Sequence, residues 1–166
     1  MRARLLRGFA LLLPLLVLGA GIVRGECAIR SGEIWRFDIG GYDPRDLLRG
    51  RYLRFRIEPQ WGDPHDQDLA SRDAECACLE RIAERSSAIL HAASCASARA
   101  SCESFVVFAE LAALDRFYVP EARAKELEQR LQSAAARDAA QALVSIDRNG
   151  SPTLVDLEID GVPTAP

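Results

Sequence analysis

The residues with the clearest chemical potential are four cysteines in the middle of the chain, Cys76, Cys78, Cys95 and Cys102. An even set of closely spaced thiols forms disulfides in an oxidising compartment, and four cysteines allow three connectivities. Cys76 and Cys78 are separated by one residue, which is too short for an easy bridge, so each is expected to reach to Cys95 or Cys102. We therefore predict two structural disulfides, with Cys27 left over.

The same cysteines have a second interpretation. Thiolate and imidazole ligands suit copper or zinc, so Cys76-Ala77-Cys78 together with Cys95 and His91 is a candidate soft-metal or redox site. Neither a zinc-type Cys-x-x-Cys pair nor a thioredoxin motif is present, which favours the disulfides. A metal-binding or thiol-redox envelope protein is the alternative function.

A second candidate site combines a charged corner, formed by Asp43, Arg45 and Asp46, with one face of a predicted strand. The residues on that face are Tyr52, Arg54 and Arg56. We interpret these six residues as an interaction surface. A structural interpretation has equal weight, because Asp43 before Pro44 can cap a turn and Asp46 can pair with Arg49.

The sequence lacks the common catalytic motifs that would indicate an enzyme. The sequence contains no Gly-x-Ser-x-Gly, no His-Glu-x-x-His and no phosphate loop, and Lys125 has no identifiable serine partner. We predict a non-catalytic protein without a cofactor. The formal net charge of −3 gives no basic field of the kind that nucleic-acid binding requires, so no nucleic-acid partner is expected.

The N-terminus has the layout of a secretory signal or a signal anchor. Three arginines precede an uncharged apolar run over residues 8–23. As a helix this run reaches about 24 Å, short of a hydrocarbon core of roughly 30 Å, although counting from Leu5 lengthens it. A cleaved signal and an uncleaved anchor both remain open. We expect residues 1–26 to form this segment and residues 27–166 to form one extracytoplasmic domain.

The elements that position these residues begin with two alternating segments. Residues 33–39 place Trp35, Phe37 and Ile39 on one face, and residues 52–57 place Leu53, Phe55 and Ile57 opposite Tyr52, Arg54 and Arg56. This period of two predicts two half-buried strands, and the second should have its cationic face outward. Residues 60–73 are polar and rich in turn formers, which predicts a loop.

The later segments predict a helix and a hairpin. Pro120 suits the first helical position, and apolar residues recur at helical spacing over residues 121–139. Asn149-Gly150 lies between two alternating runs and indicates a hairpin. A strand is expected at residues 105–108, extending toward Leu111. Residues 74–104 fit a helix by propensity and short strands by cysteine spacing, and periodicity does not separate the two.

The region around the charged corner resembles a family signature. It reads Tyr42-Asp43-Pro44-Arg45-Asp46-Leu47-Leu48-Arg49-Gly50-Arg51-Tyr52-Leu53-Arg54-Phe55. This is similar to the signature of the GDYXXLXY family of membrane-anchored proteins, and residues 116–121 and 154–161 resemble its second block. Gly50 and Tyr52 match the defining octamer, whereas Arg51, Phe55 and Ile57 stand where the family has Asp, Leu and Tyr.

The resemblance implies an uncleaved N-terminal anchor, a mainly β extracytoplasmic domain and no established biochemical activity. Members of the family look like companions of multispanning membrane proteins, and the resemblance favours strands in residues 74–104. We therefore predict an α+β fold, mainly antiparallel, with one long amphipathic helix near the C-terminus. The expected protein is held in the inner membrane by a single N-terminal anchor, with its domain in the periplasm. It would act as an accessory to an integral membrane partner.

Overall fold

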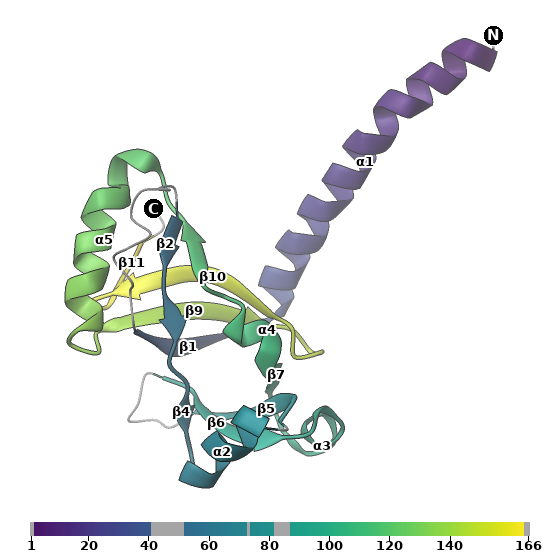
Figure 1. Ribbon diagram of the computed structural model, residues 1–166. Helices are drawn as coiled ribbons and strands as arrows, with labels where there is room; N and C mark the ends of the chain where they lie inside the picture. The colour runs from purple at the N-terminus through teal and green to yellow at the C-terminus, as the bar shows by residue number, and fades with distance from the viewer. Residues whose placement is uncertain (1, 41–51, 73, 82–86, 165–166) are drawn as a thin grey trace.

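The computed structural model describes residues 2–40, 52–72, 74–81 and 87–164, which form an α+β domain with a projecting N-terminal helix (Figure 1). The helices are α1 (Arg2–Ser31), α2 (Pro64–Arg72), α3 (Cys95–Ser101), α4 (Phe108–Ala112) and α5 (Glu121–Ala135). The strands are β1 (Glu33–Gly40), β2 (Tyr52–Arg54), β3 (Arg56–Ile57), β4 (Gln60–Trp61), β5 (Cys76–Glu80), β6 (Ile89–Ala93), β7 (Phe105–Val107), β8 (Arg116–Tyr118), β9 (Ala140–Ile146), β10 (Pro152–Ile159) and β11 (Val162–Pro163).

Three sheets organise the domain. The largest has the strand order β11-β10-β9-β1-β3, the second has the order β4-β6-β5-β7, and β2 pairs with β8 in a third. All of these pairs are antiparallel except β4 with β6. The prediction of a mainly antiparallel α+β fold is confirmed.

The largest sheet buries the face that the alternating pattern predicts. Trp35, Phe37 and Ile39 are buried, and Phe37 is only 1% exposed. The expected C-terminal hairpin is also present, because β9 pairs with β10 across a turn in which Gly150 has a φ of +84°. A positive φ of this size favours glycine, which explains how the sequence signal specifies the turn.

Helix α5 covers this sheet, but it is shorter than predicted. Leu127, Leu131 and Ala134 are its buried residues, and Figure 1 shows the helix lying along one end of β9 and β10. The helix ends at Ala135 rather than at residue 139. Asp138 adopts a φ of +54°, which a continuing right-handed helix cannot accommodate, and β9 begins two residues later.

The strand predicted over residues 52–57 is divided between two sheets. Leu53, Phe55 and Ile57 are all buried, as the alternation predicts. However, β2 pairs with β8 while β3 pairs with β1, and between them the Phe55 amide donates to the Asp115 carbonyl at 3.1 Å. The prediction of one continuous strand was wrong because the pairing partner changes at Phe55.

Two other segments differ from the sequence prediction. The expected loop over residues 60–73 contains β4 and α2, because Pro64 opens the helix and the Asp63 carboxylate accepts the His65 amide hydrogen at 2.8 Å. The strand at residue 105 ends at Val107 and α4 replaces the expected extension toward Leu111. This short alanine-containing helix buries the Leu111 side chain in the core. A strand that continued to residue 111 would direct this side chain elsewhere.

Residues 74–104, which the sequence left open, contain both kinds of structure. Strands β5 and β6 form a hairpin-like antiparallel pair, and the short helix α3 follows them. Most of the residues in α3 are alanines and serines, which do not bury a wide apolar face, and Ala98 is its buried residue. A helix this short needs tertiary support, which the cysteines provide.

A polar cluster links the two larger sheets. The Asp38 carboxylate on β1 accepts from Gln60 of β4 at 3.1 Å and from Gln141 of β9 at 3.0 Å. The Ser87 hydroxyl also donates to Asp38. Because one carboxylate collects donors from both sheets, the cluster fixes their relative position.

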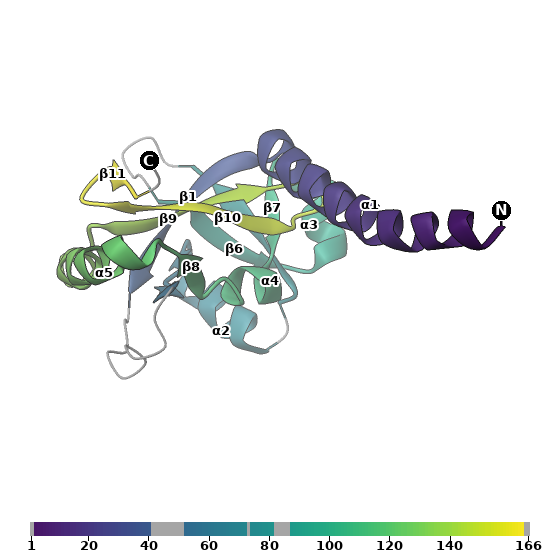
Figure 2. The same ribbon diagram turned by 90° about the horizontal axis from the view of Figure 1, so that it is seen from above.

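Helix α1 projects away from the domain as one rod and contacts it only near its C-terminal end (Figures 1 and 2). There the Ile29 carbonyl accepts from the Ser145 hydroxyl at 3.1 Å, and Gly32 passes so close to Ser145 that a Cβ would overlap it. The helix runs past residue 26, the expected end of the N-terminal segment. Among the described residues, no helix is long and apolar enough to cross a membrane.

Candidate functional site

Strands β2 and β8 bring a group of aromatic and basic side chains to the surface. Tyr52 lies opposite Tyr118, and Arg54 lies opposite Arg116. Directly opposed residues of an antiparallel pair project to the same face, so the four side chains share one side of this sheet. We call Tyr52, Arg54, Arg116 and Tyr118 the Tyr/Arg patch.

Contacts within the Tyr/Arg patch hold it in shape. The Tyr52 and Tyr118 rings meet edge to face with centroids 6.1 Å apart, and the Arg116 guanidinium lies 5.5 Å from the Tyr52 centroid. Asp115 forms ion pairs with Arg54 at 3.5 Å and with Arg116 at 3.3 Å. Tyr118 is 72% exposed even so, which leaves a large aromatic surface for another molecule.

Only part of the predicted interaction surface is found in this patch. Tyr52 and Arg54 belong to it, whereas Arg56 is exposed on β3 in a different sheet. Asp43, Arg45 and Asp46 lie outside the described residues. Arg116 and Tyr118 are further members of this surface that were not predicted, although their alternation around Phe117 is a signal of the same kind as that of Tyr52 and Arg54.

The four clustered cysteines form two disulfides, Cys76–Cys95 and Cys78–Cys102, with Cα separations of 4.9 Å and 5.6 Å. Cys95 is the first residue of α3 and Cys102 is its C-cap, while both partners lie on β5. The two bridges therefore attach both ends of one short helix to one strand. This geometry resolves the connectivity that the spacing left open.

We expect this connectivity in the protein isolated from cells. Digestion without reduction, followed by mass spectrometry, should yield linked peptides containing Cys76 with Cys95 and Cys78 with Cys102, because each pair is within normal bridging distance. The same digest after reduction is the control. Peptides that link Cys76 to Cys102, or four free thiols, would contradict the assignment.

The sulfurs in these bridges are not available as thiolate ligands in the oxidised form. The His91 ring is also occupied, because its Nδ1 lies 3.2 Å from Asp66 and its Nε2 lies 3.1 Å from Glu80. Among the described residues there is no group of three or more His, Cys, Asp or Glu side chains that could hold a metal ion. His91 instead ties β6 to α2 and β5.

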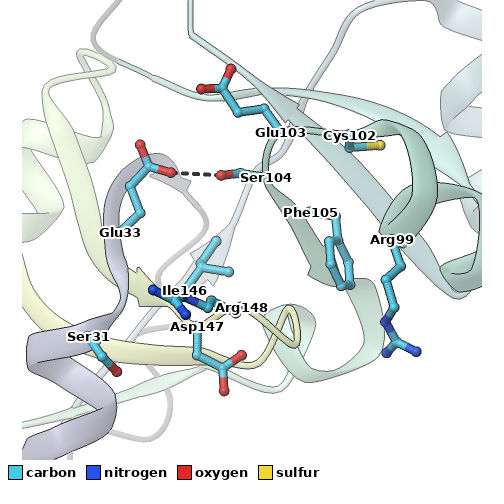
Figure 3. A pocket seen from close by; sticks show the side chains of 10 residues that line it. All are labelled: Ser31, Glu33, Arg99, Cys102, Glu103, Ser104, Phe105, Ile146, Asp147 and Arg148. Atoms are coloured by element: carbon cyan, nitrogen blue, oxygen red, sulfur yellow. Dashed lines mark hydrogen bonds between the residues drawn. The ribbon is translucent and has the colours of Figure 1, made fainter.

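A cavity of about 360 Å³ lies where α1 joins the domain (Figure 3). Its walls come from the end of α1, the start of β1, the segment from α3 to β7 and the turn between β9 and β10. The lining residues are Ser31, Glu33, Arg99, Cys102, Glu103, Ser104, Phe105, Ile146, Asp147 and Arg148. The Cys78–Cys102 bridge thus helps to position one wall.

A second cavity, of about 380 Å³, adjoins the first and shares Glu33, Glu103 and Ser104 with it. The Ser104 hydroxyl donates to the Glu33 carboxylate at 2.7 Å at this shared boundary. Arg81 lies on the other side, 2.9 Å from Glu33 and 4.4 Å from the centroid of the Trp35 ring. Both cavities lie between the largest sheet and the cysteine-containing sheet.

The fold and these sites define a disulfide-bridged α+β domain carried on a long N-terminal helix. The model of the GDYXXLXY protein family matches residues 14–157 of the chain. The chain therefore belongs to the GDYXXLXY family, as the signature predicts. Neither a curated protein nor a solved structure matches it.

Proposed function

We propose that the protein is a non-catalytic, membrane-anchored accessory domain that lies on the periplasmic side of the inner membrane and binds an integral membrane partner. The observation that carries the proposal is the surface of α1. Seven large apolar side chains are 52–69% exposed along it, and they are Leu13, Leu15, Leu16, Val17, Leu18, Ile22 and Val23. At 100° per residue they surround the helix, which is typical of a helix in an apolar environment and not of one packed on a domain.

The disulfides support a translocated domain. Bridges of this kind persist in the periplasm and are rare in the bacterial cytosol. The arginines before the apolar run favour a cytoplasmic N-terminus, which leaves the domain on the opposite side. The run is short, so anchoring requires that residues from Leu5 onward be included or that the bilayer thin locally.

The anchor predicts a specific fractionation result. The intact chain should remain in the membrane pellet after an alkaline carbonate wash, because the bilayer interior removes the exposed apolar side chains of α1 from water. It should also have the mass of an uncleaved polypeptide. A Leu16→Arg/Val17→Arg variant should be released, whereas Leu16→Ile/Val17→Ile should not. A soluble periplasmic form that begins near Ile22 would contradict the anchor.

The Tyr/Arg patch is the proposed contact with the partner. Tyr and Arg are enriched at binding hot spots, and here Asp115 and the edge-to-face contact of the two tyrosine rings hold them in position before binding. The partner surface should supply acidic and apolar groups that match this chemistry.

Crosslinking in intact membranes tests the contact. A photoreactive side chain at position 118 of the full chain should crosslink to a multispanning membrane protein, and Arg116→Gln should reduce the yield severalfold. The same probe at Val162, which is also exposed, is the control. Tyr118→Ala should lower the free energy of unfolding by no more than about 1 kcal/mol, because the side chain is 72% exposed and its main loss is one cross-strand aromatic contact. Equal crosslinking from positions 118 and 162 would show that the patch is ordinary surface.

A further inference from the structure

Strand β8 has one edge with which no other described strand pairs. On its other side it is hydrogen-bonded to β2, in a sheet that consists of these two strands. In an antiparallel pair, the N–H and C=O groups of alternate residues point toward the partner strand, and those of the residues between them point away from it. The hydrogen-bond pattern between β2 and β8 therefore decides which backbone groups of β8 reach the unpaired edge.

The Phe55 amide identifies this hydrogen-bond pattern. It donates to the Asp115 carbonyl at 3.1 Å, so Phe55 and Asp115 are a hydrogen-bonded pair at one end of the ladder. Hydrogen-bonded pairs recur every second residue, and the opposed residues two positions further along are Leu53 and Phe117. The backbone of Phe117 therefore points toward β2, and the residues on either side of it point away from β2.

Arg116 and Tyr118 are the two residues on either side of Phe117. Their N–H and C=O groups form no backbone hydrogen bond with any other residue that the structure describes. Both residues are at the surface, since the Arg116 side chain is 54% exposed and Tyr118 is 72% exposed. The edge of β8 therefore offers donors and acceptors from both residues, which is the arrangement that an added strand uses.

The side chains beside this edge favour particular residues in an added strand. Side chains that lie opposite Arg116 and Tyr118 would project over the same face as the Tyr/Arg patch. Arg116 is 3.3 Å from Asp115, but a guanidinium has more N–H donors than one carboxylate accepts. A second carboxylate is therefore favoured opposite Arg116, and an aromatic or β-branched side chain is favoured opposite Tyr118.

We infer that the integral membrane partner adds an extended segment to the edge of β8, with an acidic side chain opposite Arg116. The inference rests on the proposed function, because it specifies how the partner contacts the Tyr/Arg patch. In either strand direction, the segment would bond to the N–H and C=O groups of both Arg116 and Tyr118. Backbone hydrogen bonds provide the affinity in this mode of recognition, and side chains at alternate positions provide the specificity.

The first experiment tests the free edge without the partner. Amide hydrogen exchange is measured by NMR on the purified full chain in detergent micelles and corrected for intrinsic rates. The Arg116 and Tyr118 amides should exchange rapidly, because they point to the unpaired edge. The Phe117 amide should exchange about tenfold more slowly or less, because it donates to β2. Equal protection of the three amides would overturn the inference, since the edge would not be free.

The second experiment removes one backbone donor from the edge. The full chain with a photoreactive side chain at position 118 is crosslinked in intact membranes, and Arg116→Pro is compared with Arg116→Gln. Both variants lose the guanidinium, but only proline lacks the N–H, and proline is tolerated on a strand edge whose N–H faces solvent. The yield of crosslink to the multispanning protein should be about tenfold lower for Arg116→Pro, the equivalent of one lost hydrogen bond.

The outcomes separate this inference from the proposed function. Equal yields from the two Arg116 variants would overturn strand addition and leave the patch as the contact. No crosslink from position 118 of the parent would contradict the proposed function and the inference together. A product with the mass of two chains would overturn the inference, because the occupant would be a second copy. If Arg116→Pro does not fold, Tyr118→Pro against Tyr118→Ala, with the probe at position 52, makes the same comparison.

Discussion

Replacing Phe55 with alanine should lower the free energy of unfolding by about 3–5 kcal/mol, the usual cost of removing a large buried aromatic side chain. Phe55 is 6% exposed and belongs to the main hydrophobic core. It also lies at the point where the chain leaves the β2–β8 sheet and enters the largest sheet. The cavity left by the substitution would therefore weaken packing where the β2–β8 sheet meets the largest sheet. Urea unfolding of the full chain in detergent, followed by circular dichroism, measures the effect.

Arg56→Gln is the matched control for this prediction. Arg56 is the next residue, its side chain is exposed, and no ion pair with another described residue involves it. Its substitution should change the free energy of unfolding by about 0.5 kcal/mol or less. A Phe55→Ala variant that unfolds within about 1 kcal/mol of the parent would show that this position is not part of the core.

Local patterning was sufficient to predict the strands with one buried face. Trp35, Phe37 and Ile39 alternate with polar residues, and the same alternation identified Leu53, Phe55 and Ile57 as core residues. A period of two is typical of a strand with one face in the core, and a helix does not produce it. The hairpin at Asn149-Gly150 was predictable for a similar reason, since its turn residues specify the backbone conformation directly.

Pairing partners and short helices were not predictable in the same way. Nothing in residues 52–57 indicates that the Phe55 amide bonds to Asp115 and that the strand changes sheets there. Helix α4 has only five residues and α3 only seven, so neither produces a reliable helical period. These elements depend on contacts with segments that are distant in the chain, and the local sequence pattern does not indicate such contacts.

The candidate sites, too, were predictable only where they depend on the local sequence pattern. Tyr52 and Arg54 were identified from the face of one strand, but Arg116 and Tyr118 join them only through the pairing of β2 with β8. The cavity at the base of α1 was not predicted, because Glu33, Arg99 and Arg148 are far apart in the chain. Arg99 reaches this cavity through α3, which the two disulfides attach to β5, whereas Glu33 and Arg148 reach it through the pairing of β1 with β9.

When the two disulfides are removed one after the other, the second removal should lower the free energy of unfolding by more than the first. In the chain-entropy description, a single bridge closing about 20–25 residues contributes roughly 3 kcal/mol. The loops of Cys76–Cys95 and Cys78–Cys102 overlap, so the second bridge closes an effective loop of only about nine residues and contributes roughly 2.5 kcal/mol. Loss of both bridges should cost about 5.5 kcal/mol, which is comparable to the total stability of a small domain.

Urea unfolding of two cysteine variants tests this order. Removing Cys78 and Cys102 as serines should lower the free energy of unfolding by about 2.5 kcal/mol, and removing Cys76 and Cys95 as well should lower it by a further 3 kcal/mol or more, because the last bridge closes the long loop. Cys76 is fully buried, so its replacement adds a packing cost in the same direction. Reduction of the parent, which adds no substitution, is the control and should approach the four-serine variant. If reduction leaves the unfolding transition unchanged, the bridges do not hold α3 to β5, and the cavity wall that carries Arg99 must be fixed by packing alone.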